Sequence, residues 1–179
     1  MIPAVAFIGH HESGKTRIVV EVTKRLTERG YRIGTVKHAP DLEEVDAPGT
    51  DSAEHLKAGA VRTLLRGETA SALYFAHGET DDLENELDAF FVGCDLVVIE
   101  GYKRGPWPKI EVFRRGRDLR REPLAGEIDV LAVVTDERVA LPDGVRRFSA
   151  RDFERIADFV ETVIAGSEDD CASEEAVLL

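Results

Sequence analysis

The sequence predicts an α/β fold with a mostly parallel sheet and helices on both of its faces. Short apolar runs of strand length recur along the chain, and amphipathic stretches with helical spacing follow several of them. At the N-terminus, an apolar run, an amphipathic stretch and a second apolar run follow one another directly. This order is that of a βαβ unit, in which the two strands pair in parallel through a right-handed crossover.

The elements of this first unit follow from the side-chain pattern. Residues 2–8 form a short apolar run, as expected for a strand that is buried on both faces. Residues 16–29 place branched apolar side chains at helical spacing with charged side chains opposite, and Gly30 is suited to end the helix. Residues 32–37 predict the second strand, and the polar, proline-containing residues 38–50 predict a loop.

The rest of the chain alternates short elements with turns. Asp51 or Ser52 is expected to cap a short helix that ends at Gly59. Ser149 and Asp152 form a capping-box pattern for a helix at residues 151–164. The other expected elements are strands at residues 61–65, 72–76, 96–99 and 109–113, a helix at residues 80–91, and a further apolar run at residues 128–134. We expect residues 1–164 to form a single domain and the acidic residues 165–179 to be disordered for most of their length.

Composition excludes several classes of protein. The chain has 179 residues, of which 43% are apolar, so it can bury a core. We expect a cytoplasmic protein without membrane contact, because no stretch approaches the roughly 18 apolar residues of a membrane span and no signal peptide is evident. The net charge of −12 argues against nucleic acid as the main partner. Cys94 and Cys171 have no metal-ligand spacing, and Cys94 is expected to be a buried free thiol.

Residues 9–16 fit the pattern G-x-x-x-x-G-K-[ST], the P-loop. Because the loop follows an apolar strand and opens an amphipathic helix, we interpret it as a phosphate-binding loop and the chain as a P-loop NTPase fold, not as a glycine-rich turn with an incidental lysine. Lys15 supplies charge for the β- and γ-phosphates, and Thr16 supplies a hydroxyl for Mg²⁺. The expected nucleotide-binding residues are Gly9, His10, His11, Glu12, Ser13, Gly14, Lys15 and Thr16. Backbone N–H groups do most of this binding, so the two histidine side chains are expected to face solvent or a partner.

A second metal anchor is expected at the end of a neighbouring strand. Glu100 follows the buried strand at residues 96–99, at the strand end where α/β sheets place ligands. We assign Glu100 to Mg²⁺ through water, and Lys15 and Glu100 are our two candidate catalytic residues; the alternative for Glu100 is a surface loop acid. Lys37 and His38 end the second strand on the same sheet edge, where they either reach phosphate or substrate or are ordinary loop residues.

Two further positions have open interpretations. Asp136 follows the apolar run at residues 128–134, where its carboxylate either accepts hydrogen bonds from N1–H and the 2-amino group of guanine or belongs to a turn. Trp107 lies between two prolines and is expected to be a rigid anchor at the surface or at an interface.

Four segments in order resemble the MobB family of molybdopterin-guanine dinucleotide biosynthesis adapter proteins. They are the P-loop, residues 35–38, residues 46–52 with 58–60, and residues 98–103 with 108–112. The P-loop occurs in many families, whereas the last two segments are specific to this one. Asp46 and Asp51 lie in the third segment and are further candidate site residues.

The resemblance implies a GTP-binding protein with weak, Mg²⁺-dependent GTPase activity. It also implies a homodimer that contacts a MobA-like guanylyltransferase and a molybdopterin-containing intermediate while GMP is attached to molybdopterin. Family members often carry more histidines after the Lys-His pair, but residues 39–44 are acidic here, so a role of those histidines does not carry over. The arginine-rich residues 114–121 are either a partner or pterin-phosphate surface or a solvated face.

Three functions remain open from the sequence. The first is a GTP-dependent adapter whose hydrolysis is slow, because no water-positioning glutamine or cis arginine finger is evident after the motifs. The second is a small-molecule kinase or ligase on the same fold, for which residues 114–121 are the candidate lid. The third is a nucleotide-binding subunit that never hydrolyses its ligand.

Overall fold

The computed structural model describes the backbone of residues 1–175 except residues 41, 43–44, 76–82 and 117. The chain forms two compact units. We call Met1–His38 with Leu87–Leu179 the sheet unit and Ala39–Glu86 the hairpin unit. The single domain that we expect over residues 1–164 stays a prediction, because two compact units can still unfold in one cooperative transition.

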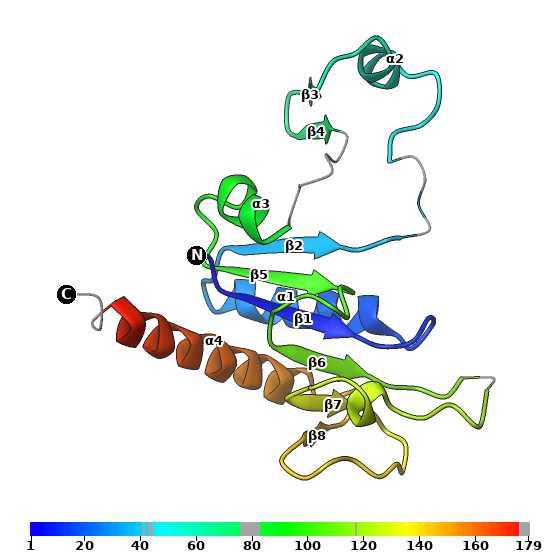
Figure 1. Cartoon of the computed structure of the whole chain (residues 1–179), viewed down its shortest axis with the longest axis vertical. Helices are drawn as coiled ribbons and strands as arrows, with labels where there is room; N and C mark the ends of the chain where they lie inside the picture. The colour runs from blue at the N-terminus through cyan, green and yellow to red at the C-terminus, as the bar shows by residue number, and fades with distance from the viewer. Residues whose placement is uncertain (41, 43–44, 76–82, 117, 176–179) are drawn as a thin grey trace. The chain divides into compact units, whose positions relative to one another are not determined.

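The sheet unit is built on a six-stranded sheet. Its strands are β1 (Ala4–Ile8), β2 (Ile33–Lys37), β5 (Leu96–Glu100), β6 (Lys109–Val112), β7 (Ala132–Val134) and β8 (Arg146–Phe148). They lie in the order β2-β5-β1-β6-β7-β8 (Figure 1), and all neighbours pair in parallel. The carboxyl ends of these strands therefore meet at one edge of the sheet. The predicted mostly parallel sheet with helices is confirmed, and β8 is a strand that the sequence pattern did not predict.

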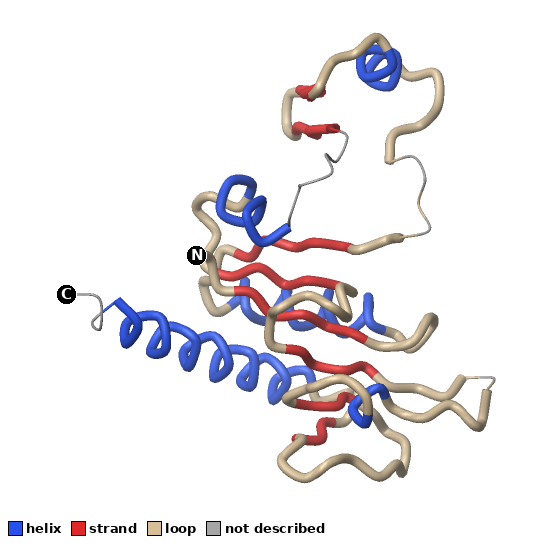
Figure 2. Tube along the Cα trace, viewed as in Figure 1, coloured by secondary structure: helices blue, strands red, loops and turns tan. Residues whose placement is uncertain are grey.

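Helices α1 (Lys15–Glu28) and α4 (Phe153–Glu175) cover one face of this sheet (Figure 2). Helix α1 buries Ile18, Val19, Val22 and Leu26, the side chains that the helical spacing placed on one side. These residues join a core formed by strand residues of the same face and by the inner side of α4. Each large apolar side chain that is buried in this way stabilises the fold by about 1.5–3 kcal/mol.

The opposite face of the sheet is also covered. Gly34 is the register partner of Val97, one residue away from Val98 in the core under α1 and α4, so it points to the opposite face. Phe91, directly after α3 (Leu83–Phe90), packs its ring on Gly34 so closely that an added Cβ would lie 2.3 Å from the ring. Residues 80–82 of the predicted helix lie outside the described residues.

Two expectations for the C-terminal part are wrong. The capping box does not form, because the Ser149 hydroxyl donates to Asp136 and α4 begins only at Phe153, after Asp152. Helix α4 also continues to Glu175, past the end expected at residue 164, because no proline interrupts the chain and an established helix propagates readily. Cys94 is a free thiol but only half-buried.

The hairpin unit contains α2 (Asp51–Lys57), β3 (Arg62–Arg66) and β4 (Ser71–Phe75). The two predicted strands pair antiparallel as a separate two-stranded sheet; residue 76 of the second prediction lies outside the described residues. The cap of α2 is Thr50, whose hydroxyl accepts from the Ala53 N–H, and not Asp51 or Ser52. None of the helices in the described part of the chain has the length and apolarity that a membrane span requires.

Candidate functional site

The P-loop connects β1 to α1 at the carboxyl edge of the sheet. Gly14, the N-cap of α1, has φ 93°, and Glu12 has φ 60°, so the chain turns twice through left-handed backbone before the helix begins. At Gly9 an added Cβ would lie 2.3 Å from the backbone oxygen of Val112 in β6. The first glycine of the motif is therefore required for close packing against the neighbouring strand, and the second for the turn into the helix.

The Lys15 ammonium lies inside this loop. Its Nζ donates to the backbone oxygen of His10 at 2.7 Å. Burial lowers the pKa of Lys15, while the Glu100 carboxylate acts in the opposite direction. The positive charges of Lys103 and Lys37 lower this pKa further, so the three lysines repel one another electrostatically here. An anionic ligand would relieve their repulsion and replace the carbonyl contact of Lys15.

Thr16 and Glu100, the two residues expected to hold Mg²⁺, are in direct contact. The Thr16 hydroxyl donates to Glu100 Oε1 at 2.7 Å, which joins the start of α1 to the end of β5. The two oxygens are of the kind that Mg²⁺ prefers, and Mg²⁺ usually takes one or two protein oxygens and completes its shell with water and phosphate. The pair therefore fits Mg²⁺, which when bound would neutralise charge on the phosphate oxygens. Lys37 is the register partner of Glu100, so it ends beside this pair.

An aromatic cluster supports the segment after Glu100. The His38 backbone N–H donates to the Glu100 carbonyl at 2.9 Å, and its ring lies 4.3 Å from the Tyr102 ring. Tyr102 has φ 56°, a strained backbone for a bulky residue, and its ring contacts Trp107 edge-on. Trp107 is only 8% exposed, so the expectation of a surface anchor is wrong. His38 therefore contacts the chain at and directly after Glu100, through its backbone N–H and through its ring.

Asp136 lies at the end of β7 on the same edge of the sheet. Its Oδ1 accepts from the Ser149 hydroxyl at 2.6 Å and from the Ala150 N–H at 3.1 Å, which ties β7 to the chain after β8. The Ser149 hydroxyl holds the pKa of Asp136 below its usual value, and the Ala150 amide adds to this. The carboxylate borders a hollow of about 480 Å³ that is lined by Thr135, Asp136, Glu137, Arg138, Val139 and Arg147. Only β6 separates β1 from β7, so the P-loop and Asp136 are two strands apart.

Residues 4–136 of this chain match the family described as molybdopterin guanine dinucleotide synthesis protein B, or MobB. The chain belongs to the MobB family. It is 38% identical over 167 residues to the molybdopterin-guanine dinucleotide biosynthesis adapter protein of Escherichia coli strain K12, covering 89% of this chain and 92% of that protein. The adapter protein of Haemophilus influenzae is 30% identical, covering 89% and 88%. A crystal structure of molybdopterin-guanine biosynthesis protein B superposes with a TM-score of 0.69 at 27% identity, over 89% of this chain and 98% of that one.

Two candidate residues of this MobB-family chain lie in the hairpin unit. Asp46 Oδ2 accepts from the Ser52 hydroxyl at 2.5 Å and from the Thr50 hydroxyl at 2.9 Å, and these two hydroxyls keep the pKa of Asp46 below its usual value. Asp46 therefore organises the start of α2. Asp51 is exposed in the first turn of that helix, where a carboxylate favours the helix dipole. A role in ligand binding stays a prediction for both.

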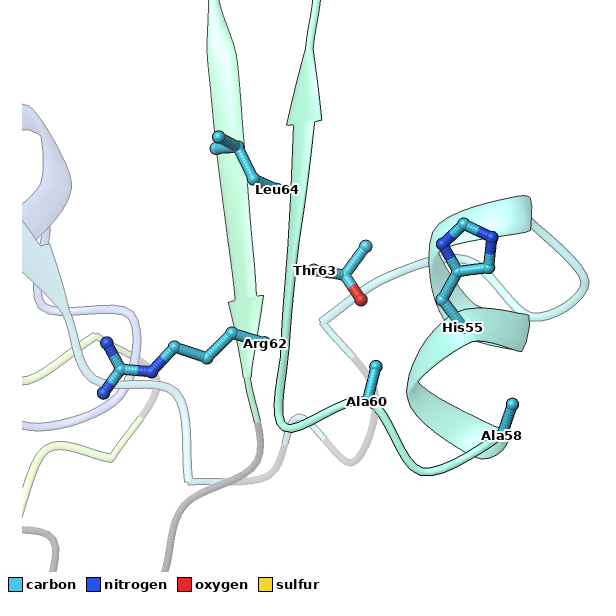
Figure 3. A pocket seen from close by; sticks show the side chains of 6 residues that line it. All are labelled: His55, Ala58, Ala60, Arg62, Thr63 and Leu64. Atoms are coloured by element: carbon cyan, nitrogen blue, oxygen red, sulfur yellow. The ribbon is translucent and has the colours of Figure 1, made fainter.

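A second hollow lies in the hairpin unit, between α2 and β3 (Figure 3). It has about 490 Å³ and is lined by His55, Ala58, Ala60, Arg62, Thr63 and Leu64. None of these residues was a candidate from the sequence, and none belongs to the P-loop. We therefore assign no ligand to it, although it is as large as the hollow beside Asp136.

The sequence did not reveal that residues 114–122 contact the P-loop. His10 Nε2 lies 3.0 Å from the Glu122 carbonyl, so this half-buried side chain also contacts its own chain, and the expectation that it faces solvent or a partner stays a prediction. Arg121 donates to the His11 carbonyl at 3.4 Å. The contacts join residues that are more than a hundred positions apart, which no local pattern can indicate.

Proposed function

We propose that this member of the MobB family is a cytoplasmic GTP-binding adapter with slow, Mg²⁺-dependent GTPase activity. In this role it assists a MobA-like guanylyltransferase in attaching GMP to a molybdopterin-containing intermediate. The observation that carries the nucleotide part is the cluster of Lys15, Thr16 and Glu100 at one sheet edge. Family membership carries the biosynthetic part.

The phosphates are proposed to lie in the P-loop. Lys15 would exchange its contact with the His10 carbonyl for phosphate oxygens, and the N–H groups at the start of α1 would bind the same anion. Thr16 and Glu100 would hold Mg²⁺, the latter through water. These residues bind and orient the triphosphate, and slow turnover then follows from the missing water-positioning glutamine.

The base is proposed to lie toward Asp136, two strands away from the P-loop. Oδ1 of Asp136 is engaged by Ser149 and Ala150, whereas Oδ2 has no hydrogen bond to any described residue. An ionised carboxylate held in this way can accept hydrogen bonds from N1–H and the 2-amino group of guanine. Adenine offers neither donor at those positions, so this residue is the proposed source of guanine selectivity.

A second copy of this chain is the partner that we propose for the hairpin unit. Leu64 and Leu73 are register partners across β3 and β4, and they are 60% and 40% exposed. The sheet has two strands, so each strand has an outer edge that can pair with another strand. An isolated hairpin is marginally stable in water, and twofold packing of the face that carries these leucines would bury them, while pairing of identical edges would satisfy the backbone groups of the outer strand.

A nucleotide competition assay tests the proposed ligand. GTP should displace a fluorescent guanine nucleotide better than ATP or CTP, and Mg²⁺ should strengthen GTP binding. The variant Thr16→Val should lose the Mg²⁺ effect because it lacks the hydroxyl, whereas Thr23→Val, farther along α1, should keep it. Equal displacement by all three nucleotides would contradict the guanine assignment, and an unchanged Mg²⁺ effect in Thr16→Val would contradict the metal assignment.

A further inference from the structure

Residues 114–122, which we call the arginine loop, run from the end of β6 toward the short helix η1 (Leu124–Gly126). Five arginines lie in residues 114–121, in a chain whose net charge is −12. The loop is either a solvated face or part of the nucleotide site. The described residues of the loop are held near its start and at its C-terminal end, which a solvated loop does not require.

A buried carboxylate holds the C-terminal end of the arginine loop. Glu111 in β6 is 0% exposed, and its two oxygens accept from the N–H groups of Leu124 and Ala125 at 2.8 and 3.0 Å. A carboxylate in the core is costly unless it is hydrogen-bonded, and these amides supply the bonds. The arginine loop must therefore return to the sheet at a defined place.

Arg115, near the start of the arginine loop, connects that start to the C-terminal end of the loop. Its guanidinium donates to the Arg121 carbonyl at 3.1 Å, to Glu122 Oε1 at 3.2 Å and to Glu137 Oε2 at 3.3 Å. The backbone N–H of Arg115 also donates to Glu137, which follows β7. One half-buried side chain thus ties the backbone of residues 121 and 122 to the carboxyl edge of the sheet.

The fixed part of the arginine loop lies against the P-loop. Arg121 donates to the His11 carbonyl at 3.4 Å, and the Glu122 carbonyl meets His10 Nε2 at 3.0 Å. His11 is exposed and precedes the start of α1, so the Arg121 guanidinium lies at the outer rim of the P-loop and not at the helix N-terminus. A guanidinium has five N–H donors, and the contact with His11 uses one.

We propose that Arg121 is a nucleotide-contacting residue that binds the terminal phosphate of the triphosphate from the outer rim of the P-loop. Arg115 and Glu111 are the residues that position it. This inference rests on the proposed function and assigns a cation, supplied by the same chain, that the motifs did not reveal. The planar donors of arginine match phosphate oxygens in pairs, which favours the phosphate with the most exposed oxygens.

The test compares the affinity for a non-hydrolysable GTP analogue with the affinity for GDP. Arg121→Ala should bind the analogue about 10-fold or more weakly, because a charged hydrogen-bond pair is lost, and should bind GDP as the wild type does. Arg120→Ala is the matched control, because Arg120 is the exposed neighbour in the same loop. The control should bind both nucleotides as the wild type does.

The positioning role has its own readout. Arg115→Ala should weaken binding of the analogue in the same direction, and the double variant should lose little more than either single variant, because both changes remove one contact. Arg121→Lys keeps the charge but not the planar, paired N–H donors of the guanidinium. It should therefore recover only part of the selectivity for triphosphate over diphosphate. Melting temperatures of all variants separate loss of contact from loss of fold.

The outcomes distinguish this inference from the proposed function. If the wild type binds the analogue and Lys15→Ala does not, but Arg121→Ala keeps the wild-type ratio of analogue to GDP affinity, the assignment of Arg121 is wrong and the proposed function stands. An equal loss of both nucleotides in Arg121→Ala would also overturn the assignment to the terminal phosphate. If Lys15→Ala binds as the wild type does, the proposed nucleotide site itself is wrong.

Discussion

The sheet unit buries a core of apolar side chains, whereas the described part of the hairpin unit buries none. Every buried apolar residue of the described chain belongs to the sheet unit, where both faces of the sheet are covered. In the hairpin unit the large apolar side chains Val61, Leu64, Leu65 and Leu73 are exposed. The first unit can be stable from its own burial, whereas the second needs another surface to cover its leucines.

The proposed nucleotide site and the proposed dimer interface fall in different units. A phosphate site needs rigid walls, and the sheet unit supplies them by closing the P-loop against Val112 of β6 and by joining Thr16 to Glu100. An assembly surface needs exposed apolar side chains and open strand edges, which the hairpin unit has. Changes in one unit should therefore alter one property and leave the other intact.

The largest expected effect comes from Lys15→Ala in the sheet unit. Triphosphate affinity should fall by about 100-fold or more, because the loop loses the charge aimed at the phosphates. The fold should persist, since the ammonium contacts only loop carbonyls and no core residue depends on it. Isothermal titration with GTP and Mg²⁺ measures the loss, and size-exclusion chromatography with light scattering should find the oligomeric state unchanged. Wild-type affinity in Lys15→Ala would contradict the assignment of nucleotide binding to the P-loop of the sheet unit.

The next effect comes from Leu64→Glu in the hairpin unit. A charge at this exposed strand position should convert a dimer into a monomer, with association weakened by about 10-fold or more, because two like charges would meet at a twofold interface. GTP affinity should remain that of the wild type. Val20→Glu is the matched control, since Val20 is 58% exposed on α1 of the sheet unit. A dimer that survives Leu64→Glu and dissociates in Val20→Glu would place the interface in the sheet unit and contradict the role proposed for the hairpin unit.

The same contrast explains which elements the sequence could predict. Strands β1 and β5 lie in continuous apolar runs because both faces are buried, whereas β6 alternates Lys109 and Glu111 with apolar residues. The bounds of all three strands were predicted to within two residues. Strand β8 was missed because Arg146 and Arg147 are exposed and only Phe148 is buried, which leaves no pattern to detect. The strands of the hairpin unit were predicted, but their separation into a second sheet depends on pairing that composition does not encode.

The candidate site also has parts that the sequence could predict and parts that it could not. The positions of Lys15, Thr16 and Glu100 at one edge of the sheet could be predicted, because a local motif and the end of a buried strand each carry their own signal, and their roles stay predictions. The capping pattern at Ser149 failed because a distant carboxylate, Asp136, took the hydroxyl. The contact of Arg121 with the P-loop is likewise tertiary. The local signal near it is Glu111, an acid between two apolar residues of β6, whose carboxylate binds the chain that follows the arginine loop.

A smaller effect should distinguish the proposed base contact at Asp136 from the proposed phosphate contacts in the P-loop, both within the sheet unit. Asp136→Asn should weaken GTP binding by about 10-fold, because the amide replaces an acceptor with a donor facing N1–H and the 2-amino group. The same amide can donate to the 2-oxo group of xanthine, so XTP should bind the variant better than it binds the wild type. Competition assays with GTP, XTP and ATP measure this exchange. If the variant loses GTP, XTP and ATP binding alike, Asp136 acts through the Ser149 contact and not through the base.

The smallest effect concerns Glu111, the one carboxylate among the buried residues of the described chain. Burial raises the pKa of Glu111, although the amides of Leu124 and Ala125 act against this. The folded protein therefore holds its proton to a higher pH than the unfolded chain does. Between the usual glutamic acid pKa of about 4.3 and the raised value, the free energy of unfolding should fall as pH rises, because the folded state binds more protons.

Glu111→Gln removes this contribution while keeping the shape of the side chain. The variant should be less stable at about pH 4, where Glu111 is largely protonated, since its amide can accept from only one of the two N–H groups. Its stability should decline less than that of the wild type between about pH 4 and pH 7. Urea unfolding at a series of pH values measures both curves, and the carboxylates with lowered pKa, such as Asp136 and Asp46, are common to both proteins and cancel. Parallel curves would mean that Glu111 is ionised throughout this range, and that the amides outweigh the cost of burying its charge.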